Sequence, residues 1–152
     1  MIDNISLEIL KILQEKARIP NIEVSRQVGL APSAVLERVK KMEKMGVIDG
    51  YEVTLNPELF NRALIAYIQV STEKNMDENV GRQLAEITDI QEVHFISGND
   101  CYLVKLRCKD TPALEAVLTK KIKPIPGIIS TKTNIVLSTR KESSRFPLPQ
   151  SF

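Results

Sequence analysis

Residues 20–46 most constrain what this chain can fold into, because they hold two short amphipathic segments separated by a break of only a few residues. The first segment is expected to be helical at about residues 21–28, and Gly29 after it suits the left-handed backbone position that ends many helices. The second begins at Pro32, a residue that favours the first position of a helix. Its apolar residues recur at the spacing of a buried helix face: Val35, Val39 and Met42. The pattern predicts a helix-turn-helix.

The opposite face of the second helix has the composition of a DNA-recognition surface. Small residues come first and positive charge follows, which suits contact with base edges at the N-terminal end and with phosphates further along. The residues predicted to contact DNA are Pro32, Ser33, Ala34, Glu37, Arg38, Lys40, Lys41 and Lys44. Basic residues on a helix are also common as a plain solvated surface, so this prediction depends on the paired helices, the glycine and the proline together.

Composition limits the kind of partner and the compartment. The 152 residues are 43% hydrophobic and 26% charged, which is ordinary for a globular protein of one or two domains. The formal net charge is only +2, so any basic footprint for DNA must be local. No apolar run approaches the roughly 18 residues that span a bilayer, and the first residues do not resemble a signal peptide. We expect a cytoplasmic protein.

The hydrophobic period changes from helical to alternating at about residue 63, which indicates a second domain. Alternation predicts a strand at 64–71, then a helix at about 76–87 and two strands joined by a tight turn at Gly98. A second helix, capped by Thr111 and Pro112, and a last strand follow. The order βαββαβ predicts a ferredoxin-like domain with two helices on one face of an antiparallel sheet. The fold class is therefore α+β.

Four segments are expected along the chain. They are a helix-turn-helix, winged-helix-like domain at 1–50, a linker or hinge strand at 51–62, the ferredoxin-like domain at 63–140 and a tail at 141–152. The uncovered face of the sheet carries either the Leu64 or the Ile65 set of apolar residues, too many for a surface in water, which favours a dimer through the sheets. The tail is either disordered or docked on a neighbouring subunit through Phe146, Leu148 and Phe152.

No catalytic or metal-binding constellation is present in the sequence. The two cysteines, Cys101 and Cys108, have an odd separation along one predicted strand, which points them to opposite faces and disfavours a disulfide. A single histidine, His94, lacks the partners of a metal site or a catalytic base and is expected to be a packed or interface residue. We therefore expect no enzyme activity and no cofactor.

Three segments at 18–51, 94–106 and 126–137 resemble, in this order and spacing, the leucine-responsive regulator/AsnC (Lrp/AsnC) family of prokaryotic transcription factors. The resemblance implies a DNA-binding regulator whose second domain binds a small amino acid between subunits and dimerises through its sheet, often assembling four dimers into an octamer. By position, the effector-binding residues would be Gly98, Asn99, Asp100, Cys101, Tyr102, Thr131 and Thr133.

The chain departs from the family pattern at two positions. Ala31 stands where a serine commonly caps the recognition helix, which removes one capping hydrogen bond. Cys101 stands where the family usually has an acidic residue suited to a ligand ammonium group. Three alternatives follow for Cys101: a small buried residue, a site with a weaker, different or absent ligand, or a redox-sensing thiol. An alternative function is a small-molecule sensor or accessory protein whose helical domain contacts protein instead of DNA.

Overall fold

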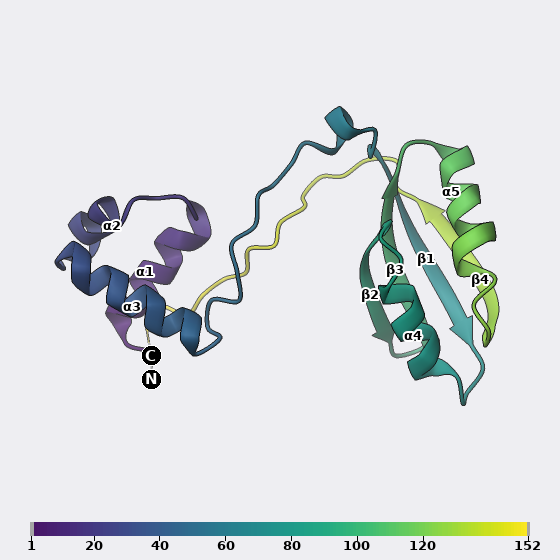
Figure 1. The fold of residues 1–152 in the computed structure, drawn as a ribbon, viewed down its shortest axis with the longest axis horizontal. Coiled ribbons are helices and arrows are strands. Elements are labelled where there is room, and N and C mark those ends of the chain that lie inside the picture. The colour runs from purple at the N-terminus through teal and green to yellow at the C-terminus, as the bar shows by residue number, and fades with distance from the viewer. Residues whose placement is uncertain (1, 152) are drawn as a thin grey trace. The chain divides into compact units, whose positions relative to one another are not determined.

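The chain forms two units in the computed structural model, which describes residues 2–151 (Figure 1). The first unit comprises Met1–Thr54 together with Lys141–Phe152, and the second comprises Leu55–Arg140. The chain therefore passes between the units twice, once in each direction. Each unit has its own apolar core, so each is described by itself.

Three helices build the first unit: α1 (Asn4–Glu15), α2 (Asn21–Val28) and α3 (Pro32–Lys44). The side chain of Asp3 caps α1 by accepting a hydrogen bond from the backbone N–H of Ser6 at 2.8 Å. Gly29 ends α2 with φ at 70°, in the left-handed region that a side chain would resist. Pro32 opens α3, and Ala31 before it supplies no side-chain cap. The predicted helix-turn-helix is confirmed.

The core of the first unit is small and lies between the three helices. The apolar stripe predicted for α3 is buried. Its residues Val35, Val39 and Met42 form one buried cluster with Ile9 of α1 and Val24 of α2. Half-buried side chains of the helices and of the segments next to them complete the cluster. A core of this size contributes only modest stability, so contacts at its edges matter for the stability of the unit.

The strand predicted within residues 51–62 does not form. Residues 51–56 adopt no regular structure, and Pro57–Phe60 forms a short 3-10 turn (η1) that ends at Asn61 with φ at 53°. Strand geometry needs a hydrogen-bonded neighbour, and no strand among residues 2–151 pairs with this segment. Its apolar side chains are exposed, among them Val53 at 81% and Leu59 at 78%.

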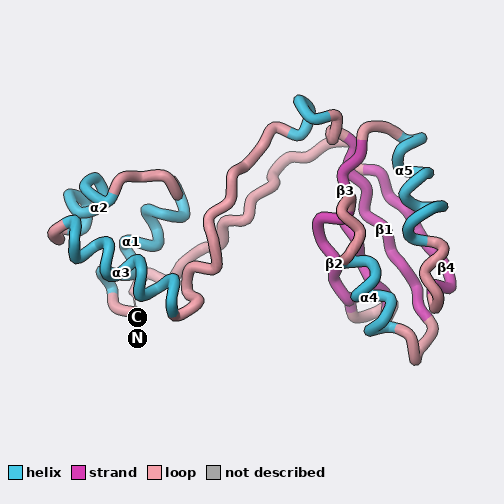
Figure 2. The backbone as a smooth tube through the Cα atoms, in the orientation of Figure 1, coloured by secondary structure: helices cyan, strands magenta, loops and turns pink. Residues whose placement is uncertain are grey.

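The second unit has the predicted βαββαβ order (Figure 2). Its elements are β1 (Leu64–Thr72), α4 (Asp77–Ala85), β2 (Ile90–Ile96), β3 (Cys101–Cys108), α5 (Thr111–Val117), a π-helical continuation η2 (Leu118–Ile122) and β4 (Ile128–Ile135). The strands lie in the order β2-β3-β1-β4, and all neighbours are antiparallel. This is the predicted ferredoxin-like sheet.

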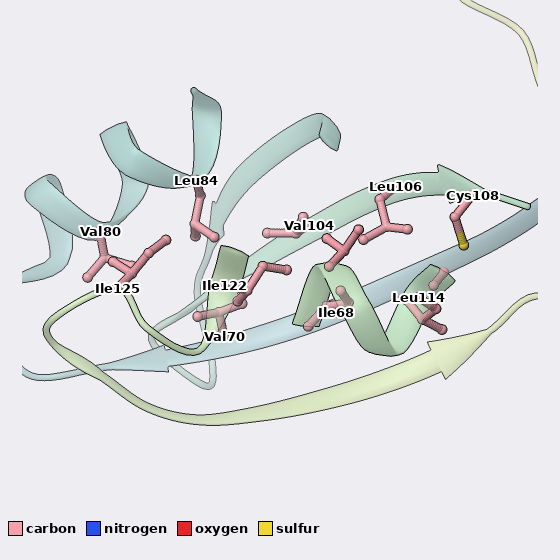
Figure 3. Close-up of a cluster of buried hydrophobic side chains, with 12 residues drawn as sticks. Ile68, Val70, Val80, Leu84, Val104, Leu106, Cys108, Leu114, Ile122 and Ile125 are labelled. Carbon is pink, nitrogen blue, oxygen red and sulfur yellow. The ribbon is translucent and has the colours of Figure 1, made fainter. Parts of the chain in front are cut away.

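The core of the second unit lies between the sheet and both helices (Figure 3). Alternate residues of β1 and β3 face the helices, and apolar residues of α4, α5 and η2 pack onto them. The buried members include Ala66, Ile68, Val70, Val80, Leu84, Val104, Leu106, Cys108, Leu114 and Ile122. Ala66, Ile68 and Val70, which share one face of β1 with Leu64, belong to the same cluster as residues of both helices. The Leu64 set of β1 therefore faces the helices.

The uncovered face of the sheet carries the Ile65 set, and it is more polar than the sequence predicted. Tyr67 and Leu103 lie there beside Lys105, which is 8% exposed and forms an ion pair with Glu92 at 3.0 Å. The hydrogen bond from Lys105 is the main reason that the pKa of the Glu92 carboxyl lies below its ordinary value.

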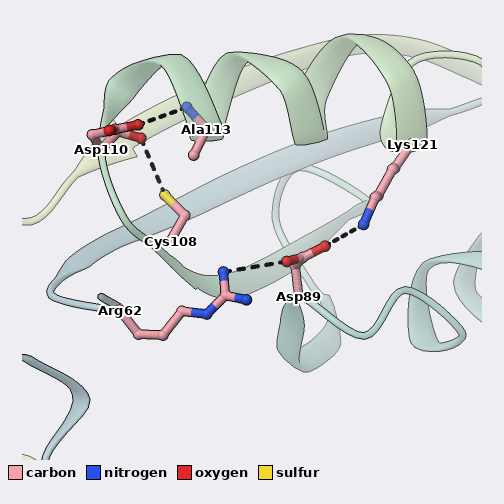
Figure 4. Close-up of polar contacts among 6 residues, drawn as sticks. All are labelled: Arg62, Asp89, Cys108, Asp110, Ala113 and Lys121. Carbon is pink, nitrogen blue, oxygen red and sulfur yellow. Dashed lines mark hydrogen bonds and ion pairs between the residues drawn. The ribbon is translucent and has the colours of Figure 1, made fainter. Parts of the chain in front are cut away.

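Two polar clusters tie the start of α5 and the end of the linker to the sheet (Figure 4). Asp110, not Thr111 as predicted, caps α5 by accepting from the backbone N–H of Ala113 at 2.9 Å. The Asp89 carboxylate, 13% exposed, pairs with Arg62 and with Lys121. Asp89, which precedes β2, therefore links the end of the linker to η2 through its two ion pairs.

Both cysteines are buried and free. The Cys108 thiol donates to the backbone carbonyl of Asp110 at 3.5 Å, and burial raises the pKa of this thiol above its ordinary value. Cys108 is thus a protonated core residue.

The tail at 141–151 contacts α1 of its own chain. Arg145 binds the Glu15 carboxylate at 2.6 Å and the Glu15 backbone carbonyl at 3.1 Å, and Gln14 donates to the carbonyl of Phe146 at 2.9 Å. The described part of the tail therefore has contacts within its own unit, while docking of its apolar side chains on a neighbouring subunit stays a prediction. Phe152 lies outside the described residues.

Candidate nucleic-acid interface and effector region

The exposed face of α3 is fixed by the burial of the opposite stripe. Each helical residue turns the direction of its side chain by about 100°, so burial of Val35, Val39 and Met42 points another set outward. The outward residues are Ser33, Glu37, Lys40, Lys41 and Lys44, and all five are exposed. Pro32 is also exposed at the helix start, whereas Ala34 is half-buried. The basic face, as we call these five outward residues, holds three cations in little more than one turn.

The three lysines of the basic face are available for a partner. Among residues 2–151 the side chains of Lys40, Lys41 and Lys44 form no ion pair or hydrogen bond. Three unpaired cations on one short surface create a local positive potential although the whole chain is nearly neutral. Such a surface attracts phosphate groups.

Arg38 has a structural role that the sequence did not predict. Its guanidinium lies 2.8 Å and 2.6 Å from the two carboxylate oxygens of Asp3 and 3.0 Å from the Ser6 hydroxyl. The Arg38 hydrogen bond first, and the Ser6 backbone N–H second, hold the pKa of the Asp3 carboxyl well below its usual range. Arg38 therefore braces α3 against the start of α1 through its Nη1 atom.

The effector positions suggested by the resemblance gather at one end of the sheet. The loop between β2 and β3 contains Gly98 at φ 97° and Asp100 at φ 43°, and Asn99 lies exposed between them. Cys101 follows at 1% exposure. The end of β1 and the start of β4 lie at the same end, because Cys101 pairs with Ser71 of β1.

The strand register brings some of these positions into line and separates others. Tyr102 pairs with Val70, which pairs in turn with Thr131, so the three form one row across the sheet. Tyr102 and Thr131 are thus two strands apart, about 10 Å by strand spacing. Thr133 lies in the next row of the same face, beside Ile68. The loop residues 98–100 lie beyond the strand ends.

Gly81 of α4 is a residue of this region that sequence reasoning missed. The Tyr102 ring lies against it so closely that an added Cβ would be 2.4 Å from the hydroxyl oxygen and 2.6 Å from the ring. The same hydroxyl donates to the backbone carbonyl of Asp77 at 2.8 Å, and the ring packs edge-on against Phe95. The signal in the sequence was a lone glycine within a helical pattern, which often marks a close packing contact.

Comparison with known proteins places this architecture in a family. Residues 2–49 match a winged helix-turn-helix DNA-binding family, and residues 65–146, more than half of the chain, match the Lrp/AsnC ligand binding domain. The chain belongs to the Lrp/AsnC family. The leucine-responsive regulatory proteins of Escherichia coli and Salmonella typhimurium are each 34% identical to it over 147 residues, covering 95% of this chain and 90% of theirs.

Solved structures of Lrp/AsnC proteins have the same fold. E. coli AsnC superposes with a TM-score of 0.89 at 28% identity, covering 97% of this chain and 99% of its own. A transcriptional regulator from Neisseria meningitidis in complex with L-methionine gives a TM-score of 0.91 at 28% identity, with 97% of both chains covered. This Lrp/AsnC chain is accordingly a DNA-binding transcriptional regulator with a ligand-binding domain. None of its helices between residues 2 and 151 combines the length and the apolar character needed to cross a membrane.

Proposed function

We propose that this regulator reads duplex DNA as a homo-oligomer, in which the basic faces of two subunits enter successive major grooves. The observation that carries the proposal is the set of three unpaired lysines on α3, at the position of a recognition helix. Half-sites would then lie about 10 bp, or a multiple of it, apart. The protein would act in the cytoplasm, and the proposal assigns it no catalytic residue and no cofactor.

Charge arithmetic supports two subunits on one operator. If all three lysines of each basic face neutralise a phosphate, a dimer makes six such contacts, and the logarithm of the affinity falls with the logarithm of salt with a slope of about −5. A single subunit would show about half of this slope. Salt dependence therefore reports how many basic faces engage DNA at once.

The uncovered sheet face supports the dimer. Tyr67 and Leu103, both half-buried, lie there beside the Lys105–Glu92 ion pair, and a second copy covering this face would remove their remaining apolar surface from water. Exposed apolar groups of the linker, among them Val53 and Leu59, offer further surface for larger assemblies such as an octamer.

A small amino acid is the proposed effector, and it would act by favouring one assembly over another. The relative from N. meningitidis was solved with L-methionine. In this chain the residues proposed to hold an amino acid are Gly98, Asn99, Asp100, Cys101, Tyr102, Thr131 and Thr133.

Cys101 offers a direct test of effector binding. A buried thiol cannot pair with a ligand ammonium group as a carboxylate does, so we expect weak binding by the natural chain. Cys101→Asp should bind L-methionine or L-leucine more tightly in calorimetry, with Cys101→Ser as the control of similar size. Equal affinities of the two variants would remove the missing carboxylate as an explanation.

The first experiment is a mobility-shift titration of the purified chain on its own promoter region and on random DNA, at two salt concentrations, with and without a pool of amino acids. Tighter and salt-sensitive binding to the promoter, changed by an amino acid, is the expected result. Specific binding that no amino acid changes would remove the proposed effector. No preference over random DNA would overturn the proposed sequence-specific reading of DNA.

A further inference from the structure

The basic face of α3 contains one acidic side chain, and its placement is unusual. Glu37 lies on the outward side of the helix, one turn after Ser33 and directly before the three lysines. Among the described residues its carboxylate forms no ion pair or hydrogen bond, although Lys41 follows at the i+4 position. The other glutamate of the helix, Glu43, instead accepts a hydrogen bond from Tyr51 at 2.8 Å. Glu37 is thus an unpaired anion on the surface that would face DNA.

The side chains that usually discriminate bases are otherwise missing from this face. Arginine reads guanine and asparagine or glutamine reads adenine through paired hydrogen bonds. Residues 32–44 contain neither asparagine nor glutamine, and their one arginine, Arg38, is held by Asp3 and Ser6. The lysines lie toward the C-terminal end of the helix, where phosphate contacts are expected. Glu37 is left as the longest base-reading group near the N-terminal end.

We propose that Glu37 reads a C·G base pair by accepting a hydrogen bond from the N4 amino group of cytosine in the major groove. The inference rests on the proposed function, since it requires α3 in that groove. Cytosine is favoured over the other bases because its amino group has no acceptor beside it on the major-groove edge. Adenine places N7 next to its amino group, and guanine and thymine present acceptors that repel a carboxylate.

The neighbours of Glu37 make an anion tolerable in the groove. Lys40, Lys41 and Lys44 lie on the same face and offset the repulsion between the carboxylate and the DNA phosphates. Ser33 precedes Glu37 by four residues, about 6 Å along the helix axis, which corresponds to about two base-pair steps. Ser33 hydrogen-bonds to several bases, so the discriminating position in each half-site is the one facing Glu37.

The test is selection of binding sites from randomised duplex DNA by the full-length chain and by three variants: Glu37→Gln, Glu37→Ala and Glu115→Gln. The last makes the same charge change on an exposed helix position of the second unit and serves as the matched control. The natural chain should select cytosine at one position of each half-site, and another base there should weaken binding about 5- to 150-fold. Glu37→Gln should shift that position to adenine, because a carboxamide matches adenine N6 and N7. Glu37→Ala should lose the preference.

The outcomes separate this inference from the function on which it depends. A shift from cytosine to adenine by Glu37→Gln, with no change by Glu115→Gln, supports base reading by Glu37. An identical selected site for the natural chain and Glu37→Gln would overturn base reading while leaving DNA recognition by α3 intact. Failure of the natural chain to enrich any sequence would overturn the proposed function itself. Circular dichroism of each variant checks that α3 remains folded.

Discussion

The basic face of α3 and the proposed effector region of the second unit differ in how far the side chains proposed to bind DNA or effector are exposed. On α3 the lysines and Glu37 project into solvent, while burial of Val35 and its neighbours and the Arg38–Asp3 ion pair hold the helix in place. In the second unit, Cys101 is 1% exposed, and the Tyr102 ring is wedged against Gly81. We infer that function and stability are separable on the basic face and coupled in the effector region.

The largest expected effect is on DNA affinity, without loss of stability. Replacing Lys40, Lys41 and Lys44 with alanine should reduce affinity by about 100-fold or more at moderate salt and flatten the salt dependence, because phosphate contacts are lost in every subunit. Fluorescence anisotropy at several salt concentrations measures both quantities. The unfolding midpoint should hardly change, because exposed lysine side chains without partners are removed.

The matched control replaces three exposed lysines of the second unit, Lys109, Lys120 and Lys123, with alanine. This variant has the same net charge as the first. If it lost DNA affinity to the same degree, bulk charge would explain binding, and the comparison between the two regions would fail.

Gly81→Ala should affect stability and ligand binding together. Alanine favours a helix over glycine by up to about 1 kcal/mol, but its Cβ would collide with the Tyr102 ring. We expect the free energy of unfolding to fall by about 1–3 kcal/mol, as for other overpacked sites. Effector affinity should fall as well, because Tyr102 must move and lose its hydrogen bond to the Asp77 carbonyl. Chemical denaturation and calorimetry measure the two effects.

Two further variants test the cause of the Gly81 effect. At Gly50 an added Cβ meets nothing within 4 Å, so Gly50→Ala should leave stability nearly unchanged. Combining Gly81→Ala with Tyr102→Leu should recover the intrinsic helix gain of alanine relative to Tyr102→Leu alone. A double variant that loses as much as Gly81→Ala by itself would show that the ring contact is not the cause.

The Arg38–Asp3 ion pair should make the first unit sensitive to acid. The Asp3 carboxyl has a lower pKa in the folded than in the unfolded chain, so its stabilising contribution is present above the ordinary aspartate pKa of about 4 and is lost as pH falls below it. Asp3→Asn keeps a good N-cap but removes the charge. Its unfolding midpoint should lie below that of the natural chain at pH 7, and the two should converge toward pH 2.

Asp49→Asn is the control for this experiment, because Asp49 is exposed and lies in the same unit without a described partner. It should follow the natural chain at every pH. A constant gap between Asp3→Asn and the natural chain from pH 7 to pH 2 would exclude the ion pair as the source of the difference.

The smallest expected effect concerns the tail. Arg145→Ala removes an ion pair whose side chains are 51% and 73% exposed, so the loss of stability should be below about 1 kcal/mol. Hydrogen exchange at the C-terminal amides of α1 should be faster in this variant than in Arg140→Ala, which alters a tail-side arginine without a described partner. Equal exchange rates would mean that the tail does not hold α1 in solution.

Much of the fold follows from local periodicity. Three predictions of this kind are confirmed: the helical stripe of α3, the turn at Gly29 and the alternating strand that begins at Leu64. Each depends only on residues a few positions apart in the sequence. The strand predicted in the linker does not form within the described part of this chain, because a strand also needs a hydrogen-bonded neighbour. The N-cap of α5 was predicted one residue too late, at Thr111 instead of Asp110, because helix boundaries are hard to place to a single residue from sequence.

The sequence by itself determined which face of α3 is buried, which face is basic, and the order of elements in the second unit, because residues that share a face recur at fixed short spacings. Only the tertiary structure decided that Arg38 is bound to Asp3, 35 residues away, and that Arg145 is bound to Glu15, 130 residues away. It also decided that the Tyr102 ring packs against Gly81. Contacts between distant residues depend on how whole elements pack, and no short-range pattern specifies that packing.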